Sequence, residues 1–127
     1  MRGFVIFVLI TIAVFYWANN FVITGKFQRF IDNNSDKSWA LSIEYNLGAI
    51  YQLALKYDKA EFYYNKILEK PTLSKFTVDT MYNLSIVYEE TKRFDLAKET
   101  CNKIIEEYPD YKGIGKIKKR LNYMMCY

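Results

Sequence analysis

Residues 44–71 read EYNLGAIYQLALKYDKAEFYYNKILEKP, and residues 81–109 read MYNLSIVYEETKRFDLAKETCNKIIEEYP; these two stretches decide the fold. They resemble each other at a spacing of 37 residues, and a proline closes each of them. The shared residues are Tyr45-Asn46-Leu47 with Tyr82-Asn83-Leu84, Tyr51 with Tyr88, Asp58 with Asp95, Ala60 with Ala97, and Asn65-Lys66-Ile67 with Asn102-Lys103-Ile104. Internal repetition near this period is typical of arrays of stacked supersecondary units.

Each copy has the apolar pattern of two amphipathic helices joined by a short turn. Apolar residues recur at spacings of three and four, which is the period of one helical face. The first copy has the stripes Leu47, Ile50, Tyr51, Ala54 and Ala60, Tyr64, Ile67, Leu68; the second has Leu84, Val87, Tyr88 and Ala97, Cys101, Ile104, Ile105. We expect the helices to pair off at Lys56 and Arg93, with Asp58 capping the second helix of the first copy.

These positions resemble the tetratricopeptide repeat. Its pattern W-x-x-L-G-x-x-Y, then A-x-x-x-F, then P is matched in the first copy by Leu47, Gly48, Tyr51, Ala60 and Pro71, and in the second by Leu84, Tyr88, Ala97 and Pro109. The copies depart from it at Glu44 and Met81 for Trp, Ser85 for Gly, and Tyr64 and Cys101 for Phe. The resemblance covers residues 41–109. It implies an all-α solenoid of two antiparallel hairpins, residues 41–71 and 78–109, within a domain of residues 39–127.

The resemblance also implies that the first helix of each hairpin lines a concave groove that holds a partner protein's extended segment or helix. The groove residues would be Tyr45, Asn46, Ala49, Gln52, Asp79, Tyr82, Asn83, Ile86 and Glu89. Asn46 and Asn83 are the sharpest candidates, because a carboxamide can both donate to and accept from a peptide backbone. Alternatively, each Asn faces solvent or bonds locally on its own helix, and Tyr45 and Tyr82 pack within the array.

Residues 111–126 predict a basic capping helix. Ile114, Ile117, Leu121 and Met124 fall on one helical stripe, as expected of the helix that closes such an array. The chain has no acid after Asp110, and the cations there are Lys112, Lys116, Lys118, Lys119 and Arg120. They form a solvated surface, contact anionic lipid headgroups, or meet an acidic partner or nucleic acid; a general nucleic-acid binder is not expected, because the charge asymmetry is local.

The first 25 residues form a candidate transmembrane segment. No charged residue lies between Gly3 and Gly25, and about 20 apolar residues over 3–23 would give a helix of ~30 Å, the thickness of the bilayer core. Three interpretations compete: a retained single-pass anchor, which we favour, a cleaved signal peptide, and a buried core helix. We weakly favour an extracytoplasmic location for the soluble domain.

Residues 26–38, KFQRFIDNNSDKS, predict a juxtamembrane linker with at most one short helical turn. An alternative is that Gly25-Lys26-Phe27 opens the second helix of a degenerate repeat.

The composition argues against catalysis. The chain has no His, which removes the commonest general base and metal ligand, and Cys101 and Cys126 lie too far apart for a CxxC pair. We expect both cysteines to be free thiols, and we expect no catalytic residues, no metal and no cofactor. The sequence therefore predicts a membrane-anchored scaffold that binds a protein. The alternatives are a permanent accessory subunit of a membrane complex and a secreted soluble adaptor.

Overall fold

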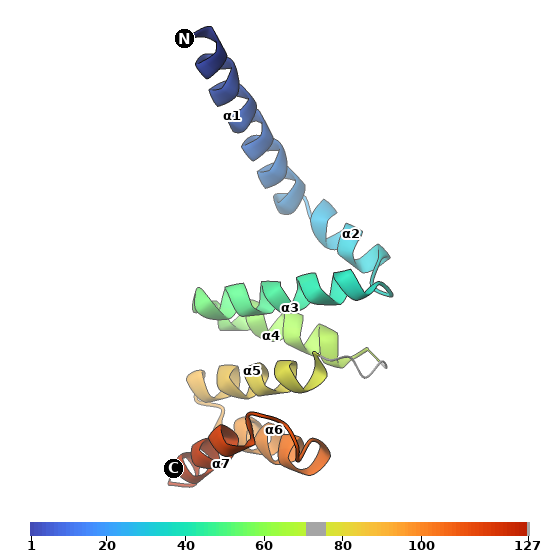
Figure 1. Cartoon of the computed structure of the whole chain (residues 1–127). Helices are drawn as coiled ribbons and strands as arrows, with labels where there is room; N and C mark the ends of the chain where they lie inside the picture. The colour runs from blue at the N-terminus through green and yellow to red at the C-terminus, as the bar shows by residue number, and fades with distance from the viewer. Residues whose placement is uncertain (71–75, 127) are drawn as a thin grey trace. The chain divides into compact units, whose positions relative to one another are not determined.

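The computed structural model describes residues 1–70 and 76–126, and within these residues it is entirely helical, with no strand (Figure 1). The helices are α1 (Arg2–Ile23), α2 (Lys26–Asn33), α3 (Ser38–Leu53), α4 (Tyr57–Leu68), α5 (Thr77–Glu90), α6 (Phe94–Glu107) and α7 (Ile114–Met124). The chain divides into an N-terminal unit, Met1–Ala40, and a C-terminal unit, Leu41–Tyr127. The all-α prediction is confirmed. Pro71, predicted to close the first hairpin, lies outside the described residues.

The N-terminal unit consists mainly of one long apolar helix. Over Arg2–Val22, α1 is long and apolar enough to cross a membrane, and none of that span is buried. Large side chains such as Phe4 and Phe15 are 73% and 75% exposed. A core helix is normally covered by other elements, so the buried-helix interpretation is wrong. The exposed apolar helix fits either a signal sequence or an anchor.

The segment expected to be a linker contains more helix than the sequence indicated. Helix α2 has eight residues, about two turns, and begins after Gly25, whose φ of 70° lies in the left-handed region that glycine adopts without strain. Within it, Gln28 Nε2 donates to Asp32 Oδ1 at 3.0 Å, an i,i+4 pair along one face.

In the C-terminal unit, α3–α4 and α5–α6 are two hairpins closed by the same turn. Leu55 and Lys92 adopt left-handed backbone conformations, with φ of 58° and 63°. The next residue in each turn donates its N–H five residues back at 2.8 Å: Lys56 to Tyr51 and Arg93 to Tyr88. This is the Schellman arrangement that ends many helices. The predicted pairing at Lys56 and Arg93 is confirmed.

The predicted cap at Asp58 is wrong in detail. Helix α4 is capped by Lys56 without a side-chain hydrogen bond, and Asp58 lies inside the first turn. A carboxylate there is still favourable, because the first turn carries the positive end of the helix dipole. Asp95 has the equivalent place in α6.

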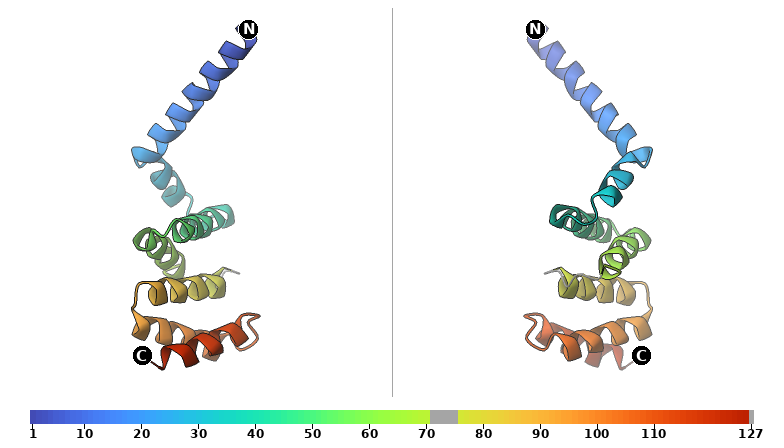
Figure 2. Two further views of the ribbon diagram at one scale, coloured as in Figure 1. Left: turned by 90° about the vertical axis from the view of Figure 1, so that its left-hand side faces the viewer. Right: turned by 90° about the vertical axis from the view of Figure 1, so that its right-hand side faces the viewer.

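The core forms where each hairpin stacks on the next helix (Figure 2). One buried cluster joins α4 to α5, and a second joins α5 to α6 and α7. The first contains Ala60, Tyr64, Leu84 and Val87, and the second contains Met81, Ala97, Cys101, Ile104, Ile117 and Met124. The predicted stripes on α4, α5 and α6 therefore face inward. Cys101 is buried, Cys126 is exposed and both are free thiols, as expected.

Part of the stripe predicted on α3 is wrong. Ile50 is 58% exposed and Ala54 is also exposed, whereas Val87, the equivalent of Ile50 in the second hairpin, is fully buried. Val87 is covered because α4 of the preceding hairpin packs on α5. Helix α3 belongs to the first hairpin, so the same sequence position has a different environment.

Helix α7 continues the register of the first helices of the hairpins. At the spacing of 37 residues, Leu84 corresponds to Leu121 and Val87 to Met124. Met124 is fully buried, as Val87 is, and Leu121 packs against the same cluster. Helix α7 thus occupies the place of the first helix of a third hairpin, and its stripe lies inward as predicted for a cap.

The substitution Gly48→Ala should destabilise the fold by about 1–3 kcal/mol, because a Cβ there would lie 2.5 Å from Cε1 of the fully buried Tyr64 ring. Gly115→Ala is the matched control: no atom lies within 4 Å of its Cβ position. The control should be neutral or stabilising by up to about 1 kcal/mol, since alanine favours helix. Thermal unfolding of the full chain in detergent, followed by circular dichroism, measures both. Equal melting temperatures for the two variants would contradict the close contact.

Candidate partner-binding face

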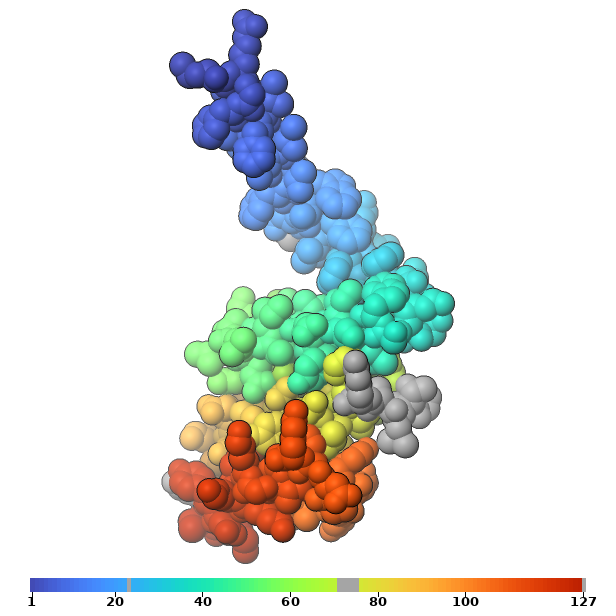
Figure 3. Space-filling model, in the orientation of Figure 1, coloured from blue at the N-terminus to red at the C-terminus, as the bar shows by residue number. Residues whose placement is uncertain are grey.

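Helices α3, α5 and α7 form one face of the C-terminal unit, the first-helix face, and side-chain bonds join each helix to the next. Asn83 on α5 bonds to Tyr45 on α3, and Arg120 on α7 bonds to Glu89 on α5. In Figure 3 the surfaces of these helices follow one another from green through yellow to red. Several of the residues predicted to line the groove take part in bonds within the domain.

The Tyr45–Asn83 pair joins the two hairpins. Asn83 Nδ2 donates to Tyr45 Oη at 3.1 Å, and the Tyr45 ring stacks on Phe76 with centroids 5.1 Å apart. Burial raises the pKa of the Tyr45 hydroxyl, which therefore stays protonated at neutral pH. Asn83 is thus engaged inside the domain with a neighbouring helix, whereas the alternative expectation was a local bond on its own helix.

Gln52 also bonds within its own hairpin. The buried Tyr64 donates its hydroxyl to Gln52 Oε1 at 2.7 Å, from α4 to α3. Burial raises the pKa of Tyr64 well above its ordinary value, so the hydroxyl is a permanent donor. The bond satisfies a polar group that the core has removed from water and fixes the ring that lies against Gly48.

Asp79 and Tyr82 contact the residue that leads into α7. The Tyr111 hydroxyl donates to Asp79 Oδ1 at 2.8 Å, and the Tyr111 and Tyr82 rings lie 6.0 Å apart. Burial raises the pKa of Tyr111, and the bond to Asp79 raises it further, because an ionised phenol could not donate to a carboxylate.

Arg120, predicted as a possible lipid or acidic-partner contact, is engaged inside the domain. Its guanidinium is directed back to α5, where Nε and Nη2 lie 2.7 and 2.6 Å from Glu89 Oε2 and Nη1 lies 3.1 Å from Ser85 Oγ. It also lies 5.6 Å from the centre of the Tyr82 ring. Glu89, predicted to face a partner, is the internal partner of Arg120. A guanidinium with a bidentate geometry suits such a half-buried pair better than an ammonium does.

The residues that remain accessible on the first-helix face are fewer than predicted. Asn46 is exposed, and Ala49 and Ile86 are half-buried with their surfaces partly open. Lys112, Lys116, Lys118 and Lys119 are all exposed, and their contact with lipid or an acidic partner stays a prediction. We call Asn46, Ala49 and Ile86 the open groove residues.

The ion pairs of two acids, Glu44 and Glu61, were missed from the sequence. Glu44 is fully buried on α3, with Oε1 3.2 Å from Lys66 Nζ and Oε2 2.5 Å from Lys70 Nζ, both in the α4 region. Arg93 donates from Nη1 and Nη2 to the two carboxylate oxygens of Glu61, at 3.0 and 2.6 Å, and its guanidinium lies 4.8 Å from the centre of the Tyr88 ring. Buried charges are retained where a partner compensates their lost hydration. The signal in the sequence that could have indicated these ion pairs was the opposite charge of residues on the facing helices.

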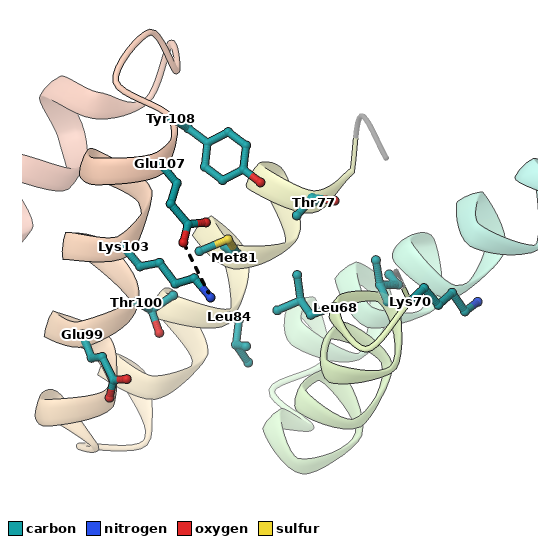
Figure 4. A pocket seen from close by; sticks show the side chains of 11 residues that line it. Leu68, Lys70, Thr77, Met81, Leu84, Glu99, Thr100, Lys103, Glu107 and Tyr108 are labelled. Atoms are coloured by element: carbon teal, nitrogen blue, oxygen red, sulfur yellow. Dashed lines mark ion pairs between the residues drawn. The ribbon is translucent and has the colours of Figure 1, made fainter. Parts of the chain in front are cut away.

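A depression is lined by residues of α4, α5 and α6 (Figure 4). Its volume is about 360 Å³. Met81 and Leu84 of α5 line it between the two other helices, and Tyr108 and the Lys103–Glu107 pair, 4.0 Å apart, lie along α6. The two side chains are 59% and 50% exposed, so the pair adds little stability. Among the described residues no group of His, Cys, Asp or Glu is arranged to hold a metal ion.

Comparison with known families agrees with this geometry. Residues 79–111 match the tetratricopeptide repeat family model. The match covers the second hairpin, and no catalytic family is found. No curated protein matches the chain. The antiparallel helix pairs pack as in a tetratricopeptide-like array, and the repeat implies a role in protein–protein interaction.

Asn83→Ala should destabilise the fold by about 1 kcal/mol, the usual net contribution of such a hydrogen bond, because it removes the donor to Tyr45. Asn46→Ala, at the equivalent but exposed position, should stay within about 0.5 kcal/mol of the parent. A double-mutant cycle with Tyr45→Phe isolates the pair, and chemical unfolding of each variant supplies the four free energies. Additive effects of N83A and Y45F would show that the bond contributes nothing.

Proposed function

We propose that the protein is a membrane-anchored scaffold that binds a partner protein on its first-helix face. The observation that carries the proposal is that one chain contains both a tetratricopeptide repeat and a 22-residue apolar helix, whose candidate span is 0% buried within the described residues. The repeat supports protein binding, and the apolar helix supports a location at a membrane. A helix of this length matches the bilayer core.

The internal bonds of the first-helix face support a specific mode of binding. Tyr45, Asn83, Asp79 and Arg120 stiffen the face, because each bonds to a neighbouring helix. A preformed surface loses little side-chain entropy on binding. The partner is then recognised by the open groove residues: the Asn46 carboxamide pairs with its backbone, while Ala49 and Ile86 contact its apolar side chains.

The variant Asn46→Ala/Ile86→Ala should lose at least about tenfold in partner capture, because truncation of central contact residues typically costs 1–2 kcal/mol or more. The measurement uses full-length tagged protein, purified from detergent-solubilised native membranes, and quantifies the co-purified proteins. The matched control is Phe62→Ala/Glu69→Ala, which truncates one exposed apolar and one exposed polar side chain on α4. Circular dichroism verifies that both variants are folded.

Equal capture by the groove variant and the α4 control would contradict binding on the first-helix face. A stoichiometric assembly that survives high salt and is lost only with unfolding would instead identify a permanent accessory subunit.

The anchor makes a separate prediction. If α1 is retained, intact-mass analysis of the membrane-bound protein should include the residues of α1, and alkaline carbonate should leave the protein in the membrane pellet. The substitution Val14→Arg, near the middle of the span, should lower the fraction of protein that stays in the membrane pellet, since a central charge costs about 2.5–3.5 kcal/mol. A mature chain that starts after α1 would identify the helix as a signal sequence.

A further inference from the structure

A depression of about 430 Å³ lies between α6 and α7. We name it the α6/α7 groove; it is lined by Lys98, Asn102, Lys118, Leu121, Asn122 and Met125. Leu121 is half-buried at the side of the core and Met125 is 75% exposed. The groove is therefore lined by two apolar side chains, Leu121 and Met125, together with polar and basic ones.

The internal repeat shows what kind of element such a surface receives. The positions 37 residues before the six lining residues, which are their equivalents in the repeat, are Glu61, Asn65, Met81, Leu84, Ser85 and Tyr88. That equivalent surface is occupied by α6. Met81 packs with Ala97, Cys101 and Ile104 of α6, while Glu61 and Tyr88 contact Arg93 at its start. The α6/α7 groove is thus the repeat-equivalent of a surface that accepts a helix.

We propose that the α6/α7 groove binds an amphipathic helix of another protein, and that this helix carries acidic side chains. Two reversals of charge point to acids. Glu61, which binds Arg93 in the earlier repeat, is replaced by Lys98. Glu44, which binds Lys66 and Lys70, is replaced two periods later by Lys118.

Within the described part of the chain, neither lysine of the groove is neutralised. Across residues 1–70 and 76–126, no ion pair is found for Lys98 or Lys118, although Lys98 is half-buried. In the earlier repeats, the facing helix supplies the opposite charge. Because complementary charge favours the correct partner and like charge rejects others, two basic positions select an acidic helix.

The chain's own helices define the sequence pattern of the partner helix. Helices α4 and α6 each present a small residue, an apolar or aromatic residue four places later and an isoleucine seven places later: Ala60, Tyr64, Ile67 and Ala97, Cys101, Ile104. Arg93 precedes Ala97 by four residues, and Lys66 follows Ala60 by six. The partner helix should therefore carry acids four residues before and six residues after its small residue.

The probe is a fluorescein-labelled peptide with the sequence of residues 93–108 and the substitutions R93E, C101A and K103E, which place the two acids and prevent disulfide exchange. Fluorescence anisotropy with the full chain in detergent micelles, at physiological salt, should show saturable binding. The substitution pair K98E/K118E in the protein should raise the dissociation constant at least about tenfold, because two attractive pairs become repulsive. M125E, at an exposed apolar position, should also weaken binding.

Two controls make the test specific. K112E/K119E changes the net charge equally, outside the groove, and should leave the dissociation constant within about twofold. A second peptide with C101A alone, which keeps Arg93 and Lys103, should bind the K98E/K118E protein at least about tenfold more tightly than it binds the parent. This restoration by exchanged charges is not expected of a structural defect.

The proposal is overturned if K98E/K118E and K112E/K119E weaken binding equally, or if the charge exchange restores nothing. It is also overturned if the full chain self-associates through this face and K98E/K118E abolishes the self-association, since the occupant would then be a second copy. Peptide binding should persist in N46A/I86A, so that failure here is distinguishable from failure of the first-helix face.

Discussion

The C-terminal unit depends on the close approach of α3 and α4, which a missing side chain makes possible. Gly48 leaves the space that the Tyr64 ring fills, and the Tyr64 hydroxyl is then satisfied by Gln52. Because Tyr64 also contacts the cluster that contains Leu84 and Val87, the position of α4 determines how α5 stacks on the first hairpin. A small-against-large contact inside one hairpin thereby sets the spacing between hairpins.

The polar residues of the first-helix face serve stability before they serve recognition. Tyr45 with Asn83, Tyr111 with Asp79 and Arg120 with Glu89 each join elements that no covalent turn links directly. Such bonds oppose slippage of one helix along the next, because their donors and acceptors meet in one register. In the proposed binding mode, a partner would therefore meet a surface that these bonds hold in place.

The helices and their pairing could be predicted from the sequence because they rest on local signals: the apolar period, the repeat of 37 residues and the turn positions at Lys56 and Arg93. The directions of long side chains could not be predicted from the sequence. Arg120 lies among lysines in the sequence, and only the position of Glu89 on the neighbouring helix determines that it bends inward. Ile50 shows the same limit, since its burial depends on what precedes its hairpin rather than on its own pattern.

The repeat nevertheless contains more information than the family pattern, because equivalent positions can be compared within one chain. Where Asn83 bonds to Tyr45, its equivalent Arg120 lies over Tyr82, so the contact between consecutive first helices is kept although its chemistry changes. Glu44 and Glu61 form ion pairs with basic residues, whereas within residues 1–70 and 76–126 no acidic partner is found for their equivalents Lys118 and Lys98. A position that keeps its geometry while its charge reverses is best explained by a change in what covers it. The inner surfaces are matched in charge to helices of the same chain. The α6/α7 groove, by contrast, has the charge that suits the acidic partner helix proposed above.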